Sequence, residues 1–318
     1  MCDALRSALV TGGTGFIGSA LVSRLLDEQV EVTCLIRPKR NAKPLHPARG
    51  LRIIEVSSFD TSSLKAKLVG ISTEVIFNLA SYGVRQEDRD ASELINGNVA
   101  LLTNLLEATA QWPIRRFVHA GSCSEYGFPL AAGALISEDQ PLRPTSLYGA
   151  AKAATVLFGN AFASRLGVPF LTLRLFGVYG KHEAPQRLIP YLLDRLERHE
   201  PVELTPGEQV RDLSFEDDVA DAFIKAASTE SLKLYEAYNV CSARPMRIRE
   251  LAEKVADIAN RPRDLLRWGV LSYRSDEPLW LVGDNGRFSA ATAWRPRVNF
   301  EEGILRVVSS RTRTWKEA

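Results

Sequence analysis

The sequence predicts an α/β protein in which helices cover both faces of a parallel sheet and a smaller lobe follows towards the C-terminus. Three observations predict this class. Apolar strand patterns alternate with helical patterns through the first half of the chain, as in doubly wound sheets. A glycine-rich turn joins the first strand to the first helix. The length of 318 residues, with 45% hydrophobic and 25% charged residues, is sufficient for a large core.

The first predicted unit is a strand, a turn and a helix. An apolar strand covers 7–10, and helical periodicity covers 19–26. Between them Gly12 permits a tight turn, Gly15 lets a pyrophosphate approach the backbone, and Gly18 lets the helix pack closely on its strand. This arrangement predicts a Rossmann-like dinucleotide site. The residues expected there are Gly12, Gly15, Phe16, Ile17 and Gly18.

The second predicted strand, 30–36, ends in a basic segment of Arg37, Pro38, Lys39 and Arg40. Sites that select NAD place an acidic residue here for the ribose 2′-hydroxyl, whereas sites for NADP place an arginine for the 2′-phosphate. Ile36 stands where the acid is expected, and Arg37, helped by Lys39 or Arg40, is suited to a phosphate. We therefore expect NADP(H) as the preferred cofactor, with NAD(H) as the alternative. A basic surface loop would leave the same pattern.

The alternation continues to residue 175. Further strands are predicted at 51–56, 75–80, 116–120 and 169–175, and helices at 62–68, 98–110 and 148–166. The last helix has apolar residues on more than one face, so more than its own sheet should bury it. One explanation is a homodimer formed through the helices near 98–110 and 148–165. The other is a helix inside the monomer.

After Gly180 the pattern changes. Helices are predicted at 187–198, 217–228 and 246–260, with a short strand within 207–215 and turn-rich segments between. We expect residues 1–178 to form the dinucleotide-binding domain, joined by a returning segment near 210–240. Residues 179–318 would mainly form a lobe over the carboxyl ends of the strands, where doubly wound sheets bind their ligands.

A tyrosine and a lysine provide the first candidate for chemistry. Tyr148 and Lys152 stand at i and i+4 of a predicted helix, so the phenol and the ammonium project from one face. A neighbouring cation favours the phenolate and lowers the pKa of a tyrosine, which makes it a competent acid or base. Ser122, just after the fifth strand, is the candidate third member. Taken alone, such a pair is more often an ordinary helix surface.

Composition and charge exclude several partners. The net charge of +2, without a basic tract, does not indicate nucleic acid or a membrane surface. No apolar run reaches about 18 residues, so we expect a cytoplasmic protein without membrane spans. Four scattered cysteines, Cys2, Cys34, Cys123 and Cys241, indicate neither a disulfide framework nor a zinc or other metal site.

Six segments carry a resemblance to a known family. They are TGGTGFIG (11–18), FNLAS (77–81), NVALLTNLLEA (98–108), GSCSEYG (121–127), PTSLYGAAK (144–152) and LRLFGVYG (173–180). In this order the chain resembles the extended short-chain dehydrogenase/reductase family of the NAD-dependent epimerase/dehydratase type, above all nucleotide-sugar 4-ketoreductases and 4-epimerases. VRDLSFEDDVADAF (210–223) and YRSDEP (273–278) extend the similarity into the lobe.

The resemblance implies roles for individual residues. Tyr148 would transfer the proton at a sugar hydroxyl or carbonyl, and Ser122 would hydrogen-bond the same oxygen. Lys152 would hold the nicotinamide ribose and lower the pKa of the tyrosine, and Asn98 would orient Lys152 or a water beside it. The implied cofactor contacts also include Arg37 and Ala80. The implied contacts to a nucleotide-sugar substrate are Ser122, Ser124, Arg187, Arg211 and Arg274, with the last two on its pyrophosphate.

Positions at which this sequence differs from the family pattern indicate which subfamilies it does not resemble. In 4,6-dehydratases an Asp-Glu pair follows the catalytic hydroxyl residue, and here those places hold Cys123 and Ser124. Elimination is therefore not expected, and Glu125 is interpreted as structural. A Cys and His pair like that of GDP-fucose synthases is also broken, because Ser124 replaces the cysteine although His182 matches the histidine. Gly177 replaces an asparagine that contacts the sugar in many relatives.

Two reactions remain. The prediction is NADPH-dependent reduction of the C4 keto group of a nucleotide-linked 4-keto-6-deoxyhexose, with Tyr148 as general acid, because Arg37 favours an exchangeable NADPH. The alternative is a nucleotide-sugar 4-epimerase with tightly bound NAD. A non-catalytic dinucleotide-sensing protein is a minor alternative, disfavoured because Ser122, Tyr148 and Lys152 are all present.

Overall fold

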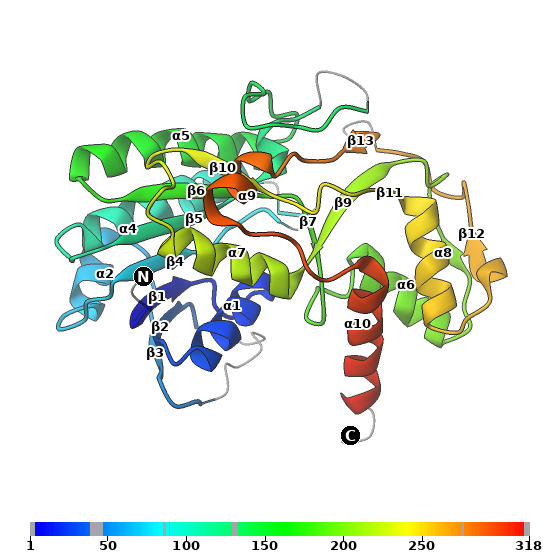
Figure 1. Ribbon diagram of the computed structural model, residues 1–318, viewed down its shortest axis with the longest axis horizontal. Helices are drawn as coiled ribbons and strands as arrows, with labels where there is room; N and C mark the ends of the chain where they lie inside the picture. Colours follow the sequence, from blue (N-terminus) through cyan, green and yellow to red (C-terminus); the bar gives the residue numbers. More distant parts are fainter. Residues whose placement is uncertain are drawn as a thin grey trace.

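A computed structural model describes residues 4–38, 47–84, 87–88, 90–128, 133–274 and 277–314. Its centre is a seven-stranded parallel sheet in the order β10-β6-β5-β4-β1-β2-β3 (Figure 1). The strands in chain order are β1 (Ser7–Thr11), β2 (Glu31–Ile36), β3 (Leu51–Glu55), β4 (Val75–Asn78), β5 (Arg116–Ser122), β6 (Phe170–Leu175) and β10 (Ala237–Val240). The predicted α/β class with a doubly wound parallel sheet is confirmed.

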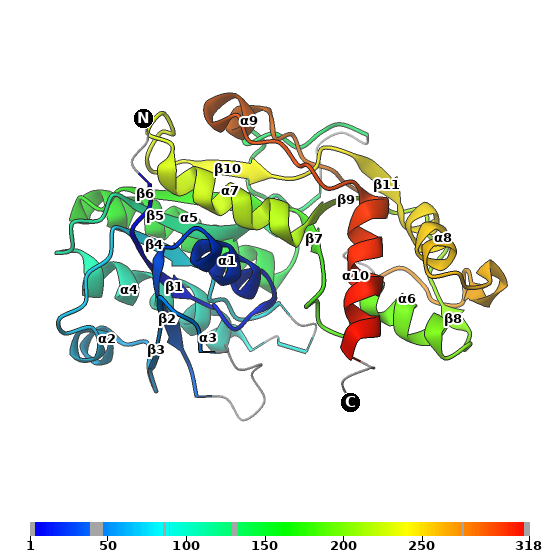
Figure 2. The ribbon, with the colours of Figure 1, turned by 60° about the horizontal axis from the view of Figure 1, so that its bottom comes forward.

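Helices cover both faces of this sheet. One face packs against α2 (Thr61–Lys67), α4 (Leu101–Thr109) and α5 (Leu147–Leu166). The other face packs against α1 (Phe16–Asp27), α7 (Glu216–Ser228) and the short α9 (Gly286–Thr292). A short helix α3 (Ala91–Leu94) and a π-helical segment η1 (Ile95–Ala100) lead into α4, and the 3-10 helix η2 (Cys123–Glu125) follows β5. Figure 2 shows both layers from the side.

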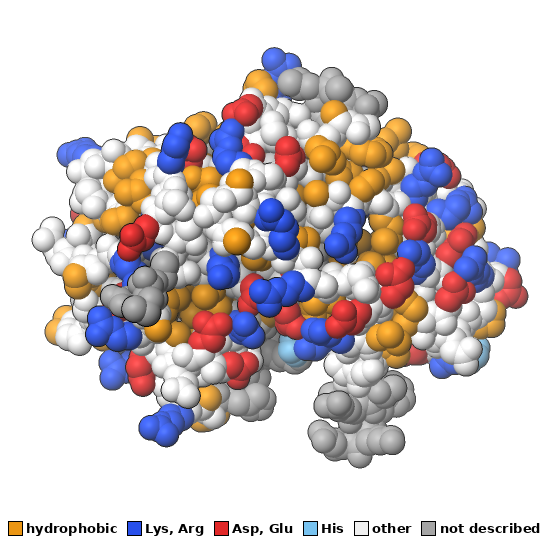
Figure 3. Space-filling model, viewed as in Figure 1, with side chains coloured by type: hydrophobic (Ala, Val, Ile, Leu, Met, Phe, Trp, Pro, Cys, Tyr) orange, Lys and Arg blue, Asp and Glu red, His pale blue; other side chains and the backbone are white. Residues whose placement is uncertain are grey.

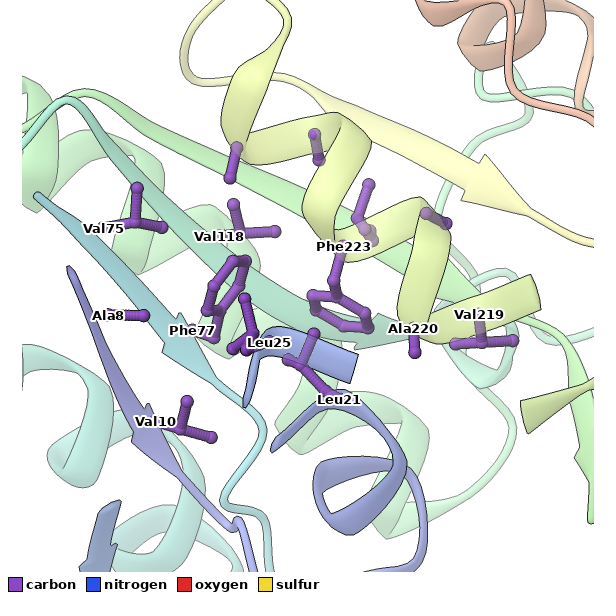
Figure 4. Close-up of a cluster of buried hydrophobic side chains, with 14 of the residues drawn as sticks. Ala8, Val10, Leu21, Leu25, Val75, Phe77, Val118, Val219, Ala220 and Phe223 are labelled. Carbon is purple, nitrogen blue, oxygen red and sulfur yellow. The ribbon is translucent and has the colours of Figure 1, made fainter. Parts of the chain in front are cut away.

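Alternation along the strands divides the apolar side chains between the two layers. Ala8 and Val10 of β1 join the core under α1 and α7, where Phe77 and Phe223 meet with ring centroids 6.2 Å apart (Figure 4). Leu9, between them in sequence, joins the opposite core under α2 and α4. A strand buried on both faces reads as a continuous apolar run, which is why the sequence predicts these strands well.

The smaller lobe is a mixed sheet with three helices. Strand β9 (Val210–Phe215) pairs with β7 (Gly177–Tyr179) and β13 (Trp280–Leu281) in parallel and with β11 (Pro245–Arg247) antiparallel. The lobe helices are α6 (Leu188–Glu197), α8 (Ile248–Ile258) and α10 (Phe300–Thr314), and a second small sheet joins β8 (Val202–Glu203) to β12 (Leu266–Arg267) beside η3 (Arg263–Leu265). The sequence patterns do not predict β10, α9 or α10.

The chain passes between the two parts more than once. After the lobe begins, α7 and β10 return to the large sheet, where β10 pairs with β6. A division at residue 178 into separate folding units stays a prediction. None of the helices in the described ranges is long and apolar enough to span a membrane. Helix α5 is not sunk inside the monomer, because Leu157 and Phe158 are 61% and 56% exposed.

Candidate active site

The candidate site lies at the carboxyl ends of the central strands. Because all strands of the large sheet are parallel, the turn after β1, the segment after β4 and the segment after β5 share one edge. The strand order reverses between β1 and β4, since β2 lies on one side of β1 and β4 on the other. In doubly wound sheets ligands bind at this reversal.

The glycine turn after β1 has room for backbone only. Gly12 has a φ of +72°, and a Cβ on it would lie 2.7 Å from the backbone nitrogen of Ala80. A Cβ on Gly18 would collide with the carbonyl oxygen of Gly12. Gly15 is the N-cap of α1 and has no side-chain cap, so the first N–H groups of the helix are left for a ligand. The turn therefore fits a dinucleotide diphosphate.

Side chains next to the glycine turn pack against the core and hold the ends of β1 and β4 together. Phe16 and Ile17 are half-buried and pack against the core under α1. The Ala80 N–H donates to the Thr11 hydroxyl at 3.2 Å, which ties the end of β4 to the end of β1. The Thr11 hydroxyl donates in turn to the Asn78 Oδ1 at 2.6 Å. These contacts fix the spacing between the two strand ends that the dinucleotide site needs.

The basic residue after β2 is exposed. Arg37 stands just past the end of the strand, with its guanidinium 5.2 Å from the centroid of the Phe59 ring. Asp60 beside Phe59 is engaged as the N-cap of α2, where its carboxylate accepts from the Ser63 N–H at 2.8 Å. Lys39 and Arg40, which the sequence suggests as helpers of Arg37, lie outside the described residues.

Tyr148 meets two serines at the strand ends. Ser146 caps α5 by accepting from the Gly149 N–H at 3.1 Å, so Tyr148 lies in the first turn of the helix. The side chains of Ser122 and Ser81 lie near the phenol and favour its ionised form. Burial raises the pKa of Tyr148 to about 12, and the two serine contacts only partly oppose this increase. The predicted lowering is therefore wrong for this arrangement.

Lys152 is buried against the end of β5. It is 2% exposed, and its Nζ donates to the Ala120 carbonyl oxygen at 2.6 Å. Burial lowers the pKa of Lys152 to about 8, although the charge of Glu125 opposes that decrease. An ammonium with a pKa near neutrality can exchange a proton at working pH.

Asn98 supports Tyr148 indirectly, through Ser81. Its Oδ1 accepts from the Ser81 hydroxyl at 2.8 Å, and its Nδ2 donates to the carbonyl oxygens of Tyr82 and Leu94 at 3.0 and 2.8 Å. Both amide hydrogens are thus engaged, and the Lys152 Nζ is bonded to Ala120 rather than to Asn98. The expected role of Asn98 through a water beside Lys152 stays a prediction. Asn98 holds Ser81 beside the phenol.

The segment after Ser122 contains no free acid. Ser122 caps η2, with its Oγ accepting from the Ser124 N–H and donating to the Ser124 Oγ, both at 3.1 Å. Burial raises the pKa of the Cys123 thiol to about 12. Glu125 is 0% exposed and paired with Arg174. The positions that hold two acids in dehydratases therefore supply neither a carboxylate nor a thiolate near neutral pH.

The structure brings together two of the three arginines expected at the substrate. Arg211 donates to one oxygen of Glu277, and Arg274 donates to the other through Nε and Nη2 at 2.9 and 2.8 Å. Arg211 is 17% exposed and lies near Cys123, and burial lowers its pKa although Glu277 opposes the decrease. Arg187 lies apart at the N-cap of α6 and pairs with Glu183 at 3.3 Å.

Sequence reasoning did not assign Ser81, Glu277 or Arg174. Ser81 ends the FNLAS segment directly after a buried strand, which is the position where polar side chains reach a shared sheet edge. Glu277 stands three residues after Arg274, a spacing that permits an ion pair. Arg174 is hidden in an apolar strand, and no local pattern indicates its buried partner.

Comparisons with known proteins identify the family of this chain. A model of the NAD dependent epimerase/dehydratase family matches residues 8–241. A UDP-glucose 4-epimerase of Mycolicibacterium smegmatis is 30% identical over 94% of this chain and 96% of that protein.

Two crystal structures share the fold. UDP-glucose 4-epimerase of Thermotoga maritima with UDP-glucose has a TM-score of 0.85 at 25% identity, over 97% of this chain and 99% of that one. DesIV of Streptomyces venezuelae, a dTDP-glucose 4,6-dehydratase with NAD bound, has a TM-score of 0.86 at 26% identity, over 97% and 98%. With its glycine turn and its Ser122, Tyr148 and Lys152, the chain belongs to the NAD-dependent epimerase/dehydratase family of enzymes.

Proposed function

We propose that this enzyme is a nucleotide-sugar 4-epimerase that retains NAD. The observation that carries the proposal is the catalytic edge itself. Tyr148 stands between Ser122 and Ser81, while the dehydratase acid positions hold a thiol with a raised pKa and a hydroxyl that is bonded to Ser122. Such a site suits reversible proton transfer at one sugar oxygen and lacks the acids that loss of water needs.

Each residue has a task in this reaction. Once its own phenol proton has been released to solvent, the Tyr148 Oη removes the proton of the C4 hydroxyl and later returns it. The Ser122 hydroxyl holds the same oxygen, and Lys152 provides a nearby proton donor with a pKa of about 8. The glycine turn and the α1 N-terminus would hold the cofactor diphosphate, and the bound nicotinamide supplies a hydride acceptor and donor. Arg211 and Arg274 would hold the diphosphate of the substrate.

Relatives support the epimerase over the reductase predicted from the sequence. Both the Mycolicibacterium and the Thermotoga proteins are UDP-glucose 4-epimerases, and the similar dehydratase structure holds NAD. The substrate would accordingly be a hexose linked to a nucleoside diphosphate.

Purified protein tests the proposal. UDP-glucose, UDP-glucuronic acid and dTDP-glucose are each incubated without added cofactor, and the products are identified by proton NMR. The expected result is C4 inversion supported by co-purified NAD, with no net change in nicotinamide absorbance. Turnover that requires added NADPH and a 4-keto sugar nucleotide would contradict it.

A 4-ketoreductase that uses NADPH is the second candidate, favoured by Arg37. This arginine is exposed past β2, and the half-buried Ile36 stands where an acid would favour NAD. Replacing Arg37 with Ala should weaken binding of NADP(H) about tenfold and leave NAD(H) unchanged if the 2′-phosphate binds there. Equal effects on both would remove the main argument for NADP.

We also propose that the enzyme is a homodimer. Helix α5 exposes Leu157 and Phe158, and Ile95 in η1 is 57% exposed. Apolar side chains of this size on neighbouring helices favour a second copy of the same surface. Light scattering should give a dimer for the parent chain and a monomer for Phe158→Glu. A parent chain that is monomeric at all concentrations would contradict the proposal.

A further inference from the structure

A buried carboxylate lies directly behind the catalytic serine. Glu125 is 0% exposed, and its Oε1 accepts from the Ser122 N–H at 2.7 Å. Its Oε2 accepts from the Arg174 Nε at 2.6 Å. Together with the bond from the Ser124 N–H to the Ser122 Oγ, this forms a capping box around η2. The backbone of Ser122 is therefore fixed by the glutamate.

The glutamate itself has little freedom to move. The Arg174 Nη1 donates to the Tyr126 hydroxyl at 2.9 Å, and that hydroxyl donates to the Asn239 Oδ1 at 2.7 Å. The guanidinium also lies 4.8 Å from the centroid of the Tyr126 ring. On the other side, a Cβ on Gly121 would lie 2.7 Å from the Glu125 Oε1. These contacts from β5, β6 and β10 keep the carboxylate in one position.

The charge of this carboxylate acts on the reacting groups. Burial lowers the pKa of Lys152, and the Glu125 charge opposes that change. Burial raises the pKa of Tyr148, and the Glu125 charge adds to the increase. Among the described residues, the titratable or charged groups near Glu125, Tyr148 and Lys152 include Arg174, Tyr126, Cys123 and His119, with Arg211 and Asp212 near Cys123 and Glu138 near Tyr126.

We propose that Glu125 is a positioning residue for the reaction, which anchors Ser122 beside Tyr148 and places a fixed negative charge behind Tyr148 and Lys152. The proposal rests on the function given above. Glu125 is buried and would act through Ser122, Tyr148 and Lys152 without touching the substrate. From the sequence alone it is interpreted only as a structural residue. Removal of the Glu125 charge should move the pKa values of Lys152 and Tyr148 in the same direction.

The test is Glu125→Gln, which keeps the acceptor for the Ser122 N–H and removes the charge. Loss of a negative neighbour lowers the pKa of both Lys152 and Tyr148, so the whole pH profile of kcat should shift to lower pH by about one unit. Glu125→Asp keeps the charge but shortens the side chain. It should keep the parent pH optimum while kcat falls about tenfold, because Ser122 loses its anchor.

Further variants separate this role from stability. Glu125→Gln leaves Arg174 buried without its partner, which is destabilising. The double variant Glu125→Gln/Arg174→Met removes both charges. Its pH profile should shift in the same direction as that of the single variant but by less, because loss of the positive charge raises both pKa values. The matched control is Asp218→Asn in α7. Asp218 is also buried and accepts two backbone N–H bonds, from Arg297 and Val298, but it is remote from Tyr148. Its pH profile should match that of the parent.

An experiment without substrate distinguishes a failure of the role proposed for Glu125 from a failure of the proposed function. Lysine labelled with ¹³C at Cε is titrated by NMR, and Lys152 is assigned with Lys152→Arg. The midpoint expected for the parent is about 8, and that for Glu125→Gln about one unit lower. If the parent turns over no nucleotide sugar, the proposed function fails while this titration still tests Glu125. An unchanged midpoint, a pH profile that superimposes on the parent, or loss of folding in every Glu125 variant would overturn the proposal.

Discussion

The candidate site has two halves, one at the edge of the large sheet and one in the lobe, and they differ in the chemical groups that they present. At the edge of the large sheet, the candidate ligand contacts are backbone groups and side chains such as Lys152, which is 2% exposed. In the lobe they come from charged side chains at the surface, with Arg274 56% exposed and Glu277 14% exposed. Figure 3 shows charges of both signs interspersed over this lobe.

This difference predicts a difference in tolerance. A backbone cradle and a buried ammonium have no alternative arrangement, so a substitution there should abolish binding or chemistry. Partly exposed ion pairs in water contribute less and can be rearranged. The sheet edge should therefore determine whether the enzyme works, and the lobe should determine how tightly the substrate binds.

The largest effect is expected for Gly18→Val, which tests the backbone cradle at the sheet edge. The new side chain would collide with the Gly12 carbonyl, so the turn must open, at a cost of about 5 kcal/mol in dinucleotide binding. Calorimetry with NAD and the dinucleotide content after purification measure the loss. Ser23→Val, an exposed position on the same helix, is the control and should bind as the parent does. Binding by Gly18→Val within threefold of the parent would show that the turn is not the cradle.

Tyr148→Phe should have the next largest effect. Without the hydroxyl, kcat should fall about a thousandfold, because general acid–base catalysis contributes about two to four orders of magnitude. Binding of a sugar nucleotide, measured by calorimetry, should change little. Tyr191→Phe in α6 is the control. Residual turnover above about a tenth of the parent rate would assign proton transfer to another group.

Arg211→Ala and Arg274→Ala test the lobe. Each should weaken binding of UDP or dTDP about thirtyfold, since a charge-assisted hydrogen bond contributes about 2 kcal/mol. Binding of NAD should stay unchanged, which separates the two halves. Arg263→Ala, another lobe arginine with acidic neighbours and 55% exposure, is the control. If both site variants bind the nucleotides normally, the substrate diphosphate lies elsewhere.

The smallest expected effect concerns a buried acid of the lobe. Burial raises the pKa of Glu183 from 4.5 to about 7, although Arg187 opposes this. The folded chain then binds more protons than the unfolded chain between these values. The contribution of protonated Glu183 to the free energy of unfolding is present below pH 4.5 and is lost as pH rises through about 7.

Glu183→Gln should therefore raise the free energy of unfolding by about 1 kcal/mol at pH 8 and leave it unchanged at pH 4. Urea denaturation at both pH values measures the difference. Glu200→Gln, at a partly exposed glutamate paired with Arg195, is the control and should not raise the free energy of unfolding at pH 8. A gain for Glu183→Gln that is equal at both pH values would indicate a packing effect.

Much of the large sheet could be predicted from the sequence, because its strands are apolar on both faces and its helices are periodic. The Gly12 to Gly18 turn, Ser122 and Tyr148 could also be predicted, since each lies at the boundary of such an element. The short strands of the lobe could not, because strands such as Trp280–Leu281 are too short to show a period.

The electrostatics of the site could not be predicted from spacing. One helical turn brings Tyr148 and Lys152 to the same face, but it does not reveal that the Nζ is bonded to Ala120 or that burial raises the phenol pKa. Long-range partners such as Arg174 for Glu125 depend on the register between β5 and β6, which no local pattern contains.

The late position of β10 in the chain has a consequence for synthesis. Strand β10 pairs with β6, yet it leaves the ribosome only after α6, β9 and α7 have been made. Until then β6 is an open sheet edge with unpaired N–H and carbonyl groups, which promotes aggregation. Nascent chains stalled before residue 237 should therefore bind chaperones more strongly than chains that extend past residue 240.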